Sequence, residues 1–233
     1  MSFYPLLLFA GIIVSITIWS RMARRDSRLL VIYLAALVSA FIGAKLVYLL
    51  AEGWLYWDHP QRWRILATGK TVLGALLGGY LGVELAKLAA GYKQATGDLF
   101  AVVAPLGIGL GRIGCLLHGC CLGHACQPGW WSIRDSVGLA RWPAAPLELA
   151  FNLLSIATFV LLRRAKLLPG QHFHLYLISY GIFRFAHEFL RETPRVMGPF
   201  SGYHFAAAAV VLLGTTGFIR RAISARSAAG ETA

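Results

Sequence analysis

Residues 29–50 read LLVIYLAALVSAFIGAKLVYLL, an apolar run of 22 residues in which Lys45 is the only charged side chain. An α-helix of about 20 apolar residues is long enough to cross the hydrocarbon core of a bilayer. The run shows no alternation of apolar and polar residues, so it lacks the period of a half-buried strand. We therefore predict a transmembrane helix over these residues.

Similar runs recur along the chain, which has 233 residues, of which 58% are hydrophobic and 14% are charged, with a mean hydropathy of +0.63. A soluble domain has about a quarter charged residues. The other predicted spans are about 3–20, 71–89, 99–117, 146–162, 174–189 and 203–219. We predict an all-α integral membrane helical bundle of about seven transmembrane helices, since seven spans of about 20 residues fit this length. The bundle forms one domain over residues 1–221, and residues 222–233 form a disordered cytoplasmic tail. The first run lacks a basic leading segment and a small-residue cleavage site, so we expect a retained helix.

Lys and Arg are unevenly divided between the two sides of these spans. One side collects Arg21, Arg24, Arg25, Arg28, Lys87, Lys93, Arg163, Arg164, Lys166, Arg220, Arg221 and Arg226. The other collects Arg62, Arg64, Lys70, Arg134, Arg141, Arg191 and Arg195. Because cytoplasmic loops carry the excess of Lys and Arg, we predict that the first side is cytoplasmic, with the N-terminus outside and the C-terminus inside.

The formal net charge of +12 bears on the partner. In a soluble protein such a charge would indicate nucleic acid. Here the basic residues lie mainly in loops between apolar spans, so we expect anionic lipid head groups as partners and no nucleic acid.

The predicted topology brings three remote segments to the extracytoplasmic side. They are the start of the third span (Lys70, Thr71), the end of the fourth (112–121) and the end of the sixth (184–191). Segments that converge at one end of a bundle can form a site between helices. We expect the functional residues there.

Arg112 and Arg184 lie within or at the edge of apolar helices. A charge there costs at least a few kcal/mol unless it is paired or hydrated, which makes each a functional candidate. The planar donor fork of Arg fits a phosphate or a carboxylate. The alternative is a structural role, in which each Arg pairs with Glu148 or Glu188 or extends to the interface. Glu188, four residues after Arg184, either fixes that arginine or acts as a base, and Arg191 lies on the same helical face.

All the cysteines fall in one segment, CLLHGCCLGHAC, residues 115–126. Its cysteines and histidines are Cys115, His118, Cys120, Cys121, His124 and Cys126. Three interpretations remain open: disulfides among Cys120, Cys121 and Cys126, a reactive thiol activated by histidine, and a metal site. The spacing matches no standard zinc pattern, so we assign no metal ligand and no cofactor from the sequence.

Two motifs carry a resemblance to a known family. Residues 111–123, GRIGCLLHGCCLG, resemble the signature of prolipoprotein diacylglyceryl transferases, Gly-Arg-[Ile/Leu]-Gly-Asn-Phe-[Ile/Leu]-Asn-Gly-Glu-x-x-Gly. Residues 183–191, FRFAHEFLR, look like the second arginine motif of that family. The glycine-rich third span resembles the family's His-Gly-Gly-Leu-Ile-Gly segment, although Gly74 or Leu77 stands where that segment has histidine. Cys115, His118 and Cys120 stand where the signature has Asn, Asn and Glu.

The resemblance implies transfer of a diacylglyceryl group from phosphatidylglycerol to the thiol of a lipoprotein cysteine or another acceptor, in a bacterial cytoplasmic (inner) membrane. The substrate-binding residues would be Gly111, Arg112, Gly114, Gly123, Arg184 and Arg191. The catalytic candidates are Cys115, His118, Cys120, His187 and Glu188, with His118 or His187 as the base. Expected partners are phosphatidylglycerol or another anionic phospholipid, the membrane and a prolipoprotein signal peptide. The alternative is a membrane redox or metal-binding protein that uses the Cys/His cluster.

Overall fold

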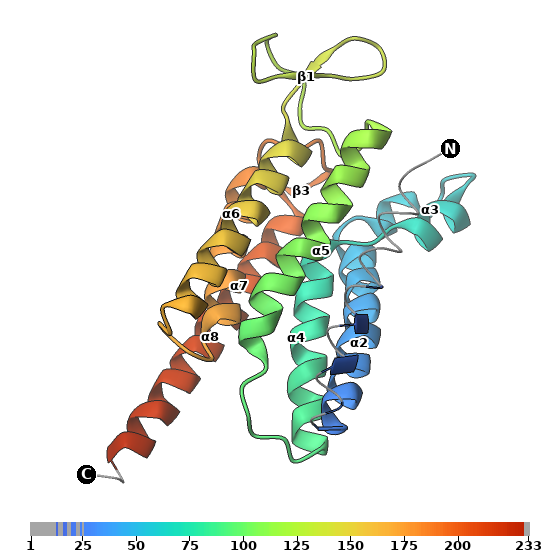
Figure 1. Cartoon of the computed structure of the whole chain (residues 1–233). Coiled ribbons are helices and arrows are strands. Elements are labelled where there is room, and N and C mark those ends of the chain that lie inside the picture. Colours follow the sequence, from blue (N-terminus) through green and yellow to red (C-terminus); the bar gives the residue numbers. More distant parts are fainter. Residues whose placement is uncertain (1–12, 14–15, 18–19, 22–23, 25, 231–233) are drawn as a thin grey trace.

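The computed structural model describes residues 13, 16, 17, 20, 21, 24 and 26–230, and of residues 225–230 it describes the backbone. The first predicted span, about 3–20, lies largely outside the described residues. The long helices are α2 (Arg28–Ala51), α4 (Val72–Ala89), α5 (Gly97–His118), α6 (Ala144–Arg164), α7 (His172–Glu188) and α8 (Gly202–Gly230). They lie side by side in one bundle (Figure 1). The predicted all-α fold is therefore confirmed.

Five of these helices, α2, α4, α5, α6 and α8, are long and apolar enough to cross a membrane. The helix α7 has 17 residues. The predicted ends agree with the observed ones within two residues, except at the C-terminus. There α8 continues to Gly230, through most of the predicted tail 222–233. The chain is a multi-pass membrane protein, while the total of seven spans stays a prediction.

Close backbone contact joins α2 to α4. Gly43 of α2 faces Gly74 and Gly78 of α4, and a Cβ atom added to Gly78 would lie 2.9 Å from the Cα of Gly43. A Cβ added to Gly74 would meet the carbonyl oxygen of Gly43. Small residues at such spacing let membrane helices approach closely and gain van der Waals contact. This face of α4 is therefore fixed against α2.

The segment between α5 and α6 leaves the bundle and forms a small head. The strands β1 (Ile133–Arg134) and β2 (Ala140–Arg141) pair antiparallel, and Arg141 bonds to Asp135 at 2.9 Å and to Glu192 at 2.7 Å. A second antiparallel pair, β3 (Arg195–Met197) and β4 (Phe200–Ser201), connects α7 to α8. The short helices η1 (Gly53–Tyr56) and α3 (Arg62–Thr68) contain Trp54 and Trp63. These connections all lie at one end of the bundle (Figure 1).

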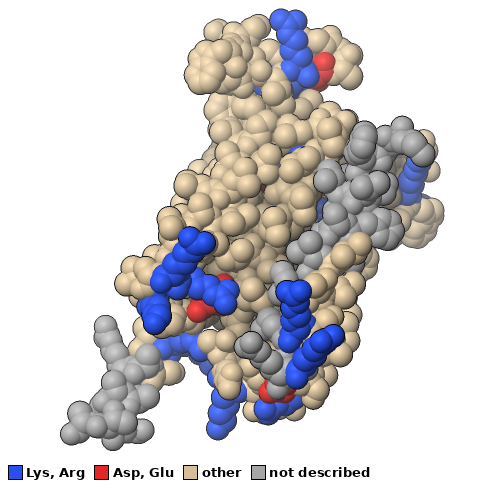
Figure 2. Space-filling model, viewed as in Figure 1, with Lys and Arg blue, Asp and Glu red and all other residues tan. Residues whose placement is uncertain are grey.

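The core lies mainly along α7 and α8. Tyr176, Leu177 and Tyr180 of α7 pack with Leu73 of α4 and Val210 of α8, all of them buried. The outer faces of the long helices expose many large apolar side chains, as a lipid-facing surface requires. Figure 2 shows many Lys and Arg side chains toward the lower end of the molecule, a largely uncharged middle, and further charged side chains on the head at the top.

Candidate active site

A polar stripe runs along α7 at four-residue intervals: Tyr176, Tyr180, Arg184 and Glu188. This spacing puts the four side chains on one helical face. All four are buried. The upper part of the stripe therefore carries an arginine and a glutamate inside the bundle, at the end where the connecting strands lie.

Glu148 of α6 is the first of two buried carboxylates that organise this end. Its Oε1 atom accepts hydrogen bonds from Nη2 of Arg112 at 2.9 Å and from the hydroxyl of Tyr180 at 2.7 Å. Nη1 of Arg191 lies 3.6 Å from its other oxygen. A buried carboxylate is stable only when paired and hydrogen-bonded. Glu148 thus joins α5, α6 and α7 through one side chain.

Glu188 is the second buried carboxylate. Its Oε2 atom forms an ion pair with Nη2 of Arg184, which lies 2.8 Å away and one turn earlier on the same helix. The hydroxyl of Thr193 donates to it at 2.7 Å and that of Ser201 at 3.2 Å. Arg191 lies 3.8 Å away. Glu188 therefore connects Arg184 to the segment that follows α7.

Each of the three arginines has nitrogen donors that lack a hydrogen-bond partner among the described residues. Within the described part of the chain, Nε of Arg112, Nε and Nη1 of Arg184, and Nε and Nη1 of Arg191 are buried without a hydrogen-bond partner. Three guanidinium groups against two carboxylates leave one net positive charge. Buried donors are normally satisfied. Unused donors with a positive charge make this arginine cluster (Arg112, Arg184, Arg191) suited to an anion.

A cavity of about 920 Å³ adjoins the cluster, enclosed mainly by α2, α4 and α5. Lys70, Gly111, Arg112 and Cys115 line one end, and its middle is lined mostly by small and apolar side chains. Its other end is lined by Lys87, Lys93, Arg220 and Arg221, among others. Arg112 lines the cavity and also bonds to Glu148, so it connects the cavity to the buried cluster.

The signature segment turns sharply after α5, and this turn gathers three sulfurs. Gly119 ends the helix at φ +61° and Cys121 also has a positive φ of +58°. The thiol of Cys115 donates to Sγ of Cys121 at 3.5 Å, and Sγ of Cys120 lies within 4.8 Å of both. The thiol of Cys115, with Arg112 and Arg191, holds the pKa of Cys121 below its usual value. All the cysteines are free thiols, so the structure contains none of the disulfides considered from the sequence.

The two candidate bases lie in different surroundings. Nε2 of His187 accepts a bond from the indole of Trp142 at 3.3 Å, and its ring stacks on Phe183. His118 is exposed, and its Nδ1 lies 3.2 Å from the carbonyl oxygen of Gly114. The lone pair of His187 Nε2 is therefore engaged, whereas His118 is exposed.

The predicted glycines have distinct environments. Gly111 lines the cavity, and a Cβ there would meet nothing within 4 Å. Gly114 is buried in α5. Gly123 forms an isolated antiparallel β-bridge with Arg191. A Cβ atom added to Gly123 would lie 2.6 Å from the carbonyl oxygen of Leu190. Gly123 therefore holds the segment after the cysteines against the end of α7.

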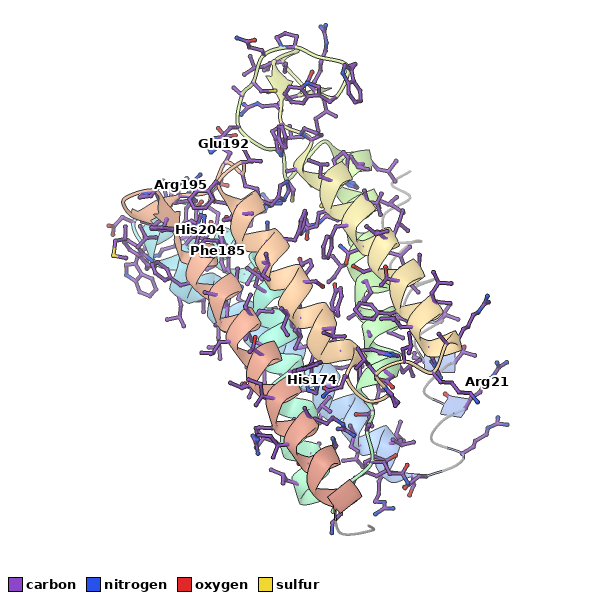
Figure 3. All side chains as sticks on the ribbon, turned by 90° about the vertical axis from the view of Figure 1, so that its left-hand side faces the viewer. Arg21, His174, Phe185, Glu192, Arg195 and His204 are labelled. Carbon is purple, nitrogen blue, oxygen red and sulfur yellow. The ribbon has the colours of Figure 1, made fainter. Side chains whose placement is uncertain are left out.

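Several residues of the site were not predicted from the sequence. Asn152 bonds to the carbonyl oxygen of Glu148 at 2.7 Å and accepts from Tyr176 at 2.9 Å, which extends the polar network along α6. Arg195 donates to the carbonyl oxygen of Phe189 at 3.1 Å and so caps α7. Figure 3 shows Arg195, Glu192, Phe185 and His204 near the upper end of α7 and α8, with His174 farther down. The four-residue spacing on α7 was the available signal for Tyr176 and Tyr180.

The chain matches the model of one protein family, prolipoprotein diacylglyceryl transferase, over residues 1–220. The chain belongs to this family.

Its relatives include the phosphatidylglycerol–prolipoprotein diacylglyceryl transferase 2 of Clostridium perfringens, which is 32% identical over 167 residues, or 68% of this chain and 64% of the relative. The corresponding transferase of Clostridium tetani is 26% identical over 82% of this chain and 81% of the relative. The transferase of Thermotoga petrophila is 30% identical over 78% of this chain and 66% of the relative. The chain thus spans less than two thirds of the length of the first of these relatives. As the function of this chain, the alternative of a membrane redox or metal-binding protein that uses the Cys/His cluster is not supported by the family.

Proposed function

We propose that this chain transfers the diacylglyceryl group of phosphatidylglycerol to a prolipoprotein cysteine thiol, in a bacterial inner membrane. One observation carries the proposal. Arg112 lines a large cavity and belongs to a buried cluster of three arginines whose guanidinium nitrogens are not all bonded within the described chain. Such a cluster suits the phosphate of a lipid donor, and the relatives bear the name of this transferase.

The reaction is a substitution at carbon. The acceptor sulfur attacks the diacylglyceryl carbon that is bonded to a phosphate oxygen. A carbon–sulfur bond forms, the carbon–oxygen bond breaks, and glycerol phosphate leaves with the bonding electron pair. Negative charge grows on the leaving phosphate, and donors aimed at such charge usually provide the largest catalytic effect. Arg112, Arg184 and Arg191 have that role in the proposal.

Glu148 and Glu188 position the arginines. Each carboxylate bonds to one arginine at less than 3 Å and lies within 4 Å of Arg191. A guanidinium group held by a buried carboxylate loses less rotamer freedom when it binds a phosphate. Glu188 is thus assigned to positioning rather than to proton removal.

The acceptor thiol has an unperturbed pKa of about 8.5 and must lose its proton. Proton removal by His187 would break its bond to Trp142. His118 is exposed and lies between Cys115 and Cys120 in the sequence, so it is the better placed of the two histidines to act as the base. The acceptor, a prolipoprotein signal peptide, would approach the extracytoplasmic end of the bundle, where the head segment lies.

The test uses the purified full chain in detergent with phosphatidylglycerol labelled in its acyl chains and in its head-group glycerol. A lipobox peptide serves as the acceptor, and the same peptide with serine in place of cysteine is the control. We expect the acyl label on the cysteine peptide, an equal amount of glycerol phosphate, and neither product with the serine peptide. Release of glycerol phosphate without peptide labelling would indicate hydrolysis to diacylglycerol, as by a phospholipase C, and contradict the proposal.

A further inference from the structure

The three-sulfur cluster of Cys115, Cys120 and Cys121 is not explained by the arginine cluster. Its Sγ atoms lie within 4.8 Å of one another, and those of Cys115 and Cys121 lie 3.5 Å apart. Cys115 is in the last turn of α5, and the left-handed residues Gly119 and Cys121 fold the chain back over it. Cys126 is not part of this group. The turn therefore puts three sulfur ligands at one point.

The spacing fits a thiophilic d¹⁰ cation. Zinc–sulfur bonds of about 2.3 Å in a tetrahedron separate the sulfurs by about 3.8 Å. The observed separations reach this value with shifts of about an ångström or less. Three protein ligands leave the fourth position of the tetrahedron open, which is the arrangement of catalytic zinc sites.

The neighbouring charge favours the complex rather than opposing it. Nη1 of Arg112 lies 3.7 Å from Sγ of Cys115. A lone divalent cation would be repelled by this guanidinium group. Three thiolates and one Zn²⁺ instead form a complex with one net negative charge, which pairs favourably with Arg112.

We propose that Cys115, Cys120 and Cys121 bind one Zn²⁺ ion, and that the acceptor thiol becomes its fourth ligand. The second part of this inference rests on the proposed function. Coordination favours the deprotonated thiol, and the proton passes to the histidine base of the proposed function. The bound sulfur then attacks the lipid carbon as described above, with glycerol phosphate leaving. Cys115 lines the same cavity as Arg112, so the ion lies beside the proposed phosphate position.

The first test measures binding without measuring activity. The full chain is purified with reductant, stripped with a chelator, loaded with Zn²⁺ and desalted. We expect about one Zn²⁺ per chain in the wild type and below about 0.2 in Cys115→Ser, Cys120→Ser and Cys121→Ser. Cys126→Ser is the matched control and should keep the wild-type content. Loading with Co²⁺ should produce a thiolate-to-cobalt charge-transfer band in the wild type and in Cys126→Ser.

Absence of Zn²⁺ from the wild type would overturn the site. The site would also be overturned if the Cys126→Ser control lost as much Zn²⁺ as the three ligand variants. A Cys115–Cys121 disulfide that resists reductant would overturn it as well. Thermal unfolding of each variant separates loss of ligand from loss of fold.

The second test follows transfer to the lipobox peptide in the stripped and reloaded protein. We expect stripping to lower the rate more than about tenfold and Zn²⁺ to restore it. Full transfer by the stripped protein would overturn the activation step while leaving the proposed function in place. No transfer by the zinc-loaded protein would instead overturn the proposed function and the activation step together, and the zinc content would still decide the site.

Discussion

At the scale of single residues, the arrangement depends on two fully buried carboxylates. Glu148 and Glu188 have no exposed surface, and together they hold Arg112 and Arg184 at 2.9 and 2.8 Å. Both pairings that we considered as the structural alternative therefore exist. They do not exclude phosphate binding, because nitrogens of each arginine remain without a hydrogen-bond partner inside the described chain.

Replacement of Arg112 or Arg184 by lysine tests the role of the donor fork. Lysine keeps the charge but presents a single donor group. We expect each change to lower diacylglyceryl transfer by about 2–4 kcal/mol of transition-state stabilisation. The double variant should lose less than the sum, because both side chains act on one group.

The measurements are turnover and thermal stability, with Arg134→Lys in β1 as the exposed control. Wild-type turnover in both single variants would refute the phosphate role. Loss of stability in proportion to loss of turnover would favour purely structural ion pairs.

Tyr180→Phe tests the support of Glu148. The substitution removes a 2.7 Å hydrogen bond to a buried carboxylate, and we expect a loss of about 1–3 kcal/mol in the free energy of unfolding. Tyr92→Phe is the control, because the hydroxyl of Tyr92 bonds only weakly, at 3.3 Å, to Gln94 near the surface. Unfolding in detergent is the measurement. Equal stability of the two variants would mean that Tyr180 does not stabilise Glu148.

Arg112 and Arg184 could be predicted from the sequence because a charge in an apolar run is conspicuous. Their partners could not be assigned. Whether Arg112 pairs with Glu148 or Glu188 depends on how α5 is rotated against α6, which one sequence does not specify. Tyr180 and Asn152 escaped prediction because an uncharged polar residue in a membrane helix is common and gives little signal.

At the scale of elements, the helices were predictable and the connections were not. A 20-residue apolar run specifies its own helix, since lipid leaves no other way to satisfy its backbone. The β1–β2 head and the β3–β4 pair are stabilised by remote contacts such as the 2.7 Å bond between Arg141 and Glu192. The helix α8 continues to Gly230, which shows that a polar composition alone does not end a helix already begun.

The glycine contact between α2 and α4 can be tested by adding one methyl group. In Gly78→Ala the new Cβ would lie 2.9 Å from the Cα of Gly43, so we expect a loss of about 1–3 kcal/mol. Gly107→Ala in α5 is the matched control, because a Cβ there meets nothing within 4 Å. Both changes raise helix propensity by about 1 kcal/mol, so their difference isolates packing. Unfolding in detergent should rank Gly78→Ala well below Gly107→Ala, and the opposite order would contradict the contact.

At the scale of the whole molecule, charge separates the two ends. The end of the cavity that contains Lys87, Lys93, Arg220 and Arg221 lies on the side that we predict to be cytoplasmic. The opposite end contains the arginine cluster and the head segment. Anionic lipids of the cytoplasmic leaflet attract basic segments by about 1 kcal/mol for each Lys or Arg near the surface.

Reporter fusions test this orientation. A green fluorescent protein fused after Ala233 should fluoresce, whereas alkaline phosphatase at the same point should be inactive. Alkaline phosphatase inserted after Gly138, in the turn between β1 and β2, should be active. Phosphatase activity at Ala233 together with inactivity at Gly138 would show that the molecule is inverted.

The mostly apolar lining of the cavity has a consequence for the energy of lipid delivery. Moving an acyl chain into water costs about 0.8 kcal/mol for each CH₂ group, so extraction of a whole two-chain lipid is prohibitive. A donor seated between Ala75, Leu76 and Val83 of α4 and Phe100, Val103 and Ile108 of α5 would keep its tails in hydrocarbon surroundings. Only the head group then has to reach Arg112. Substrate supply becomes lateral diffusion within one leaflet, which requires neither a carrier protein nor an aqueous step.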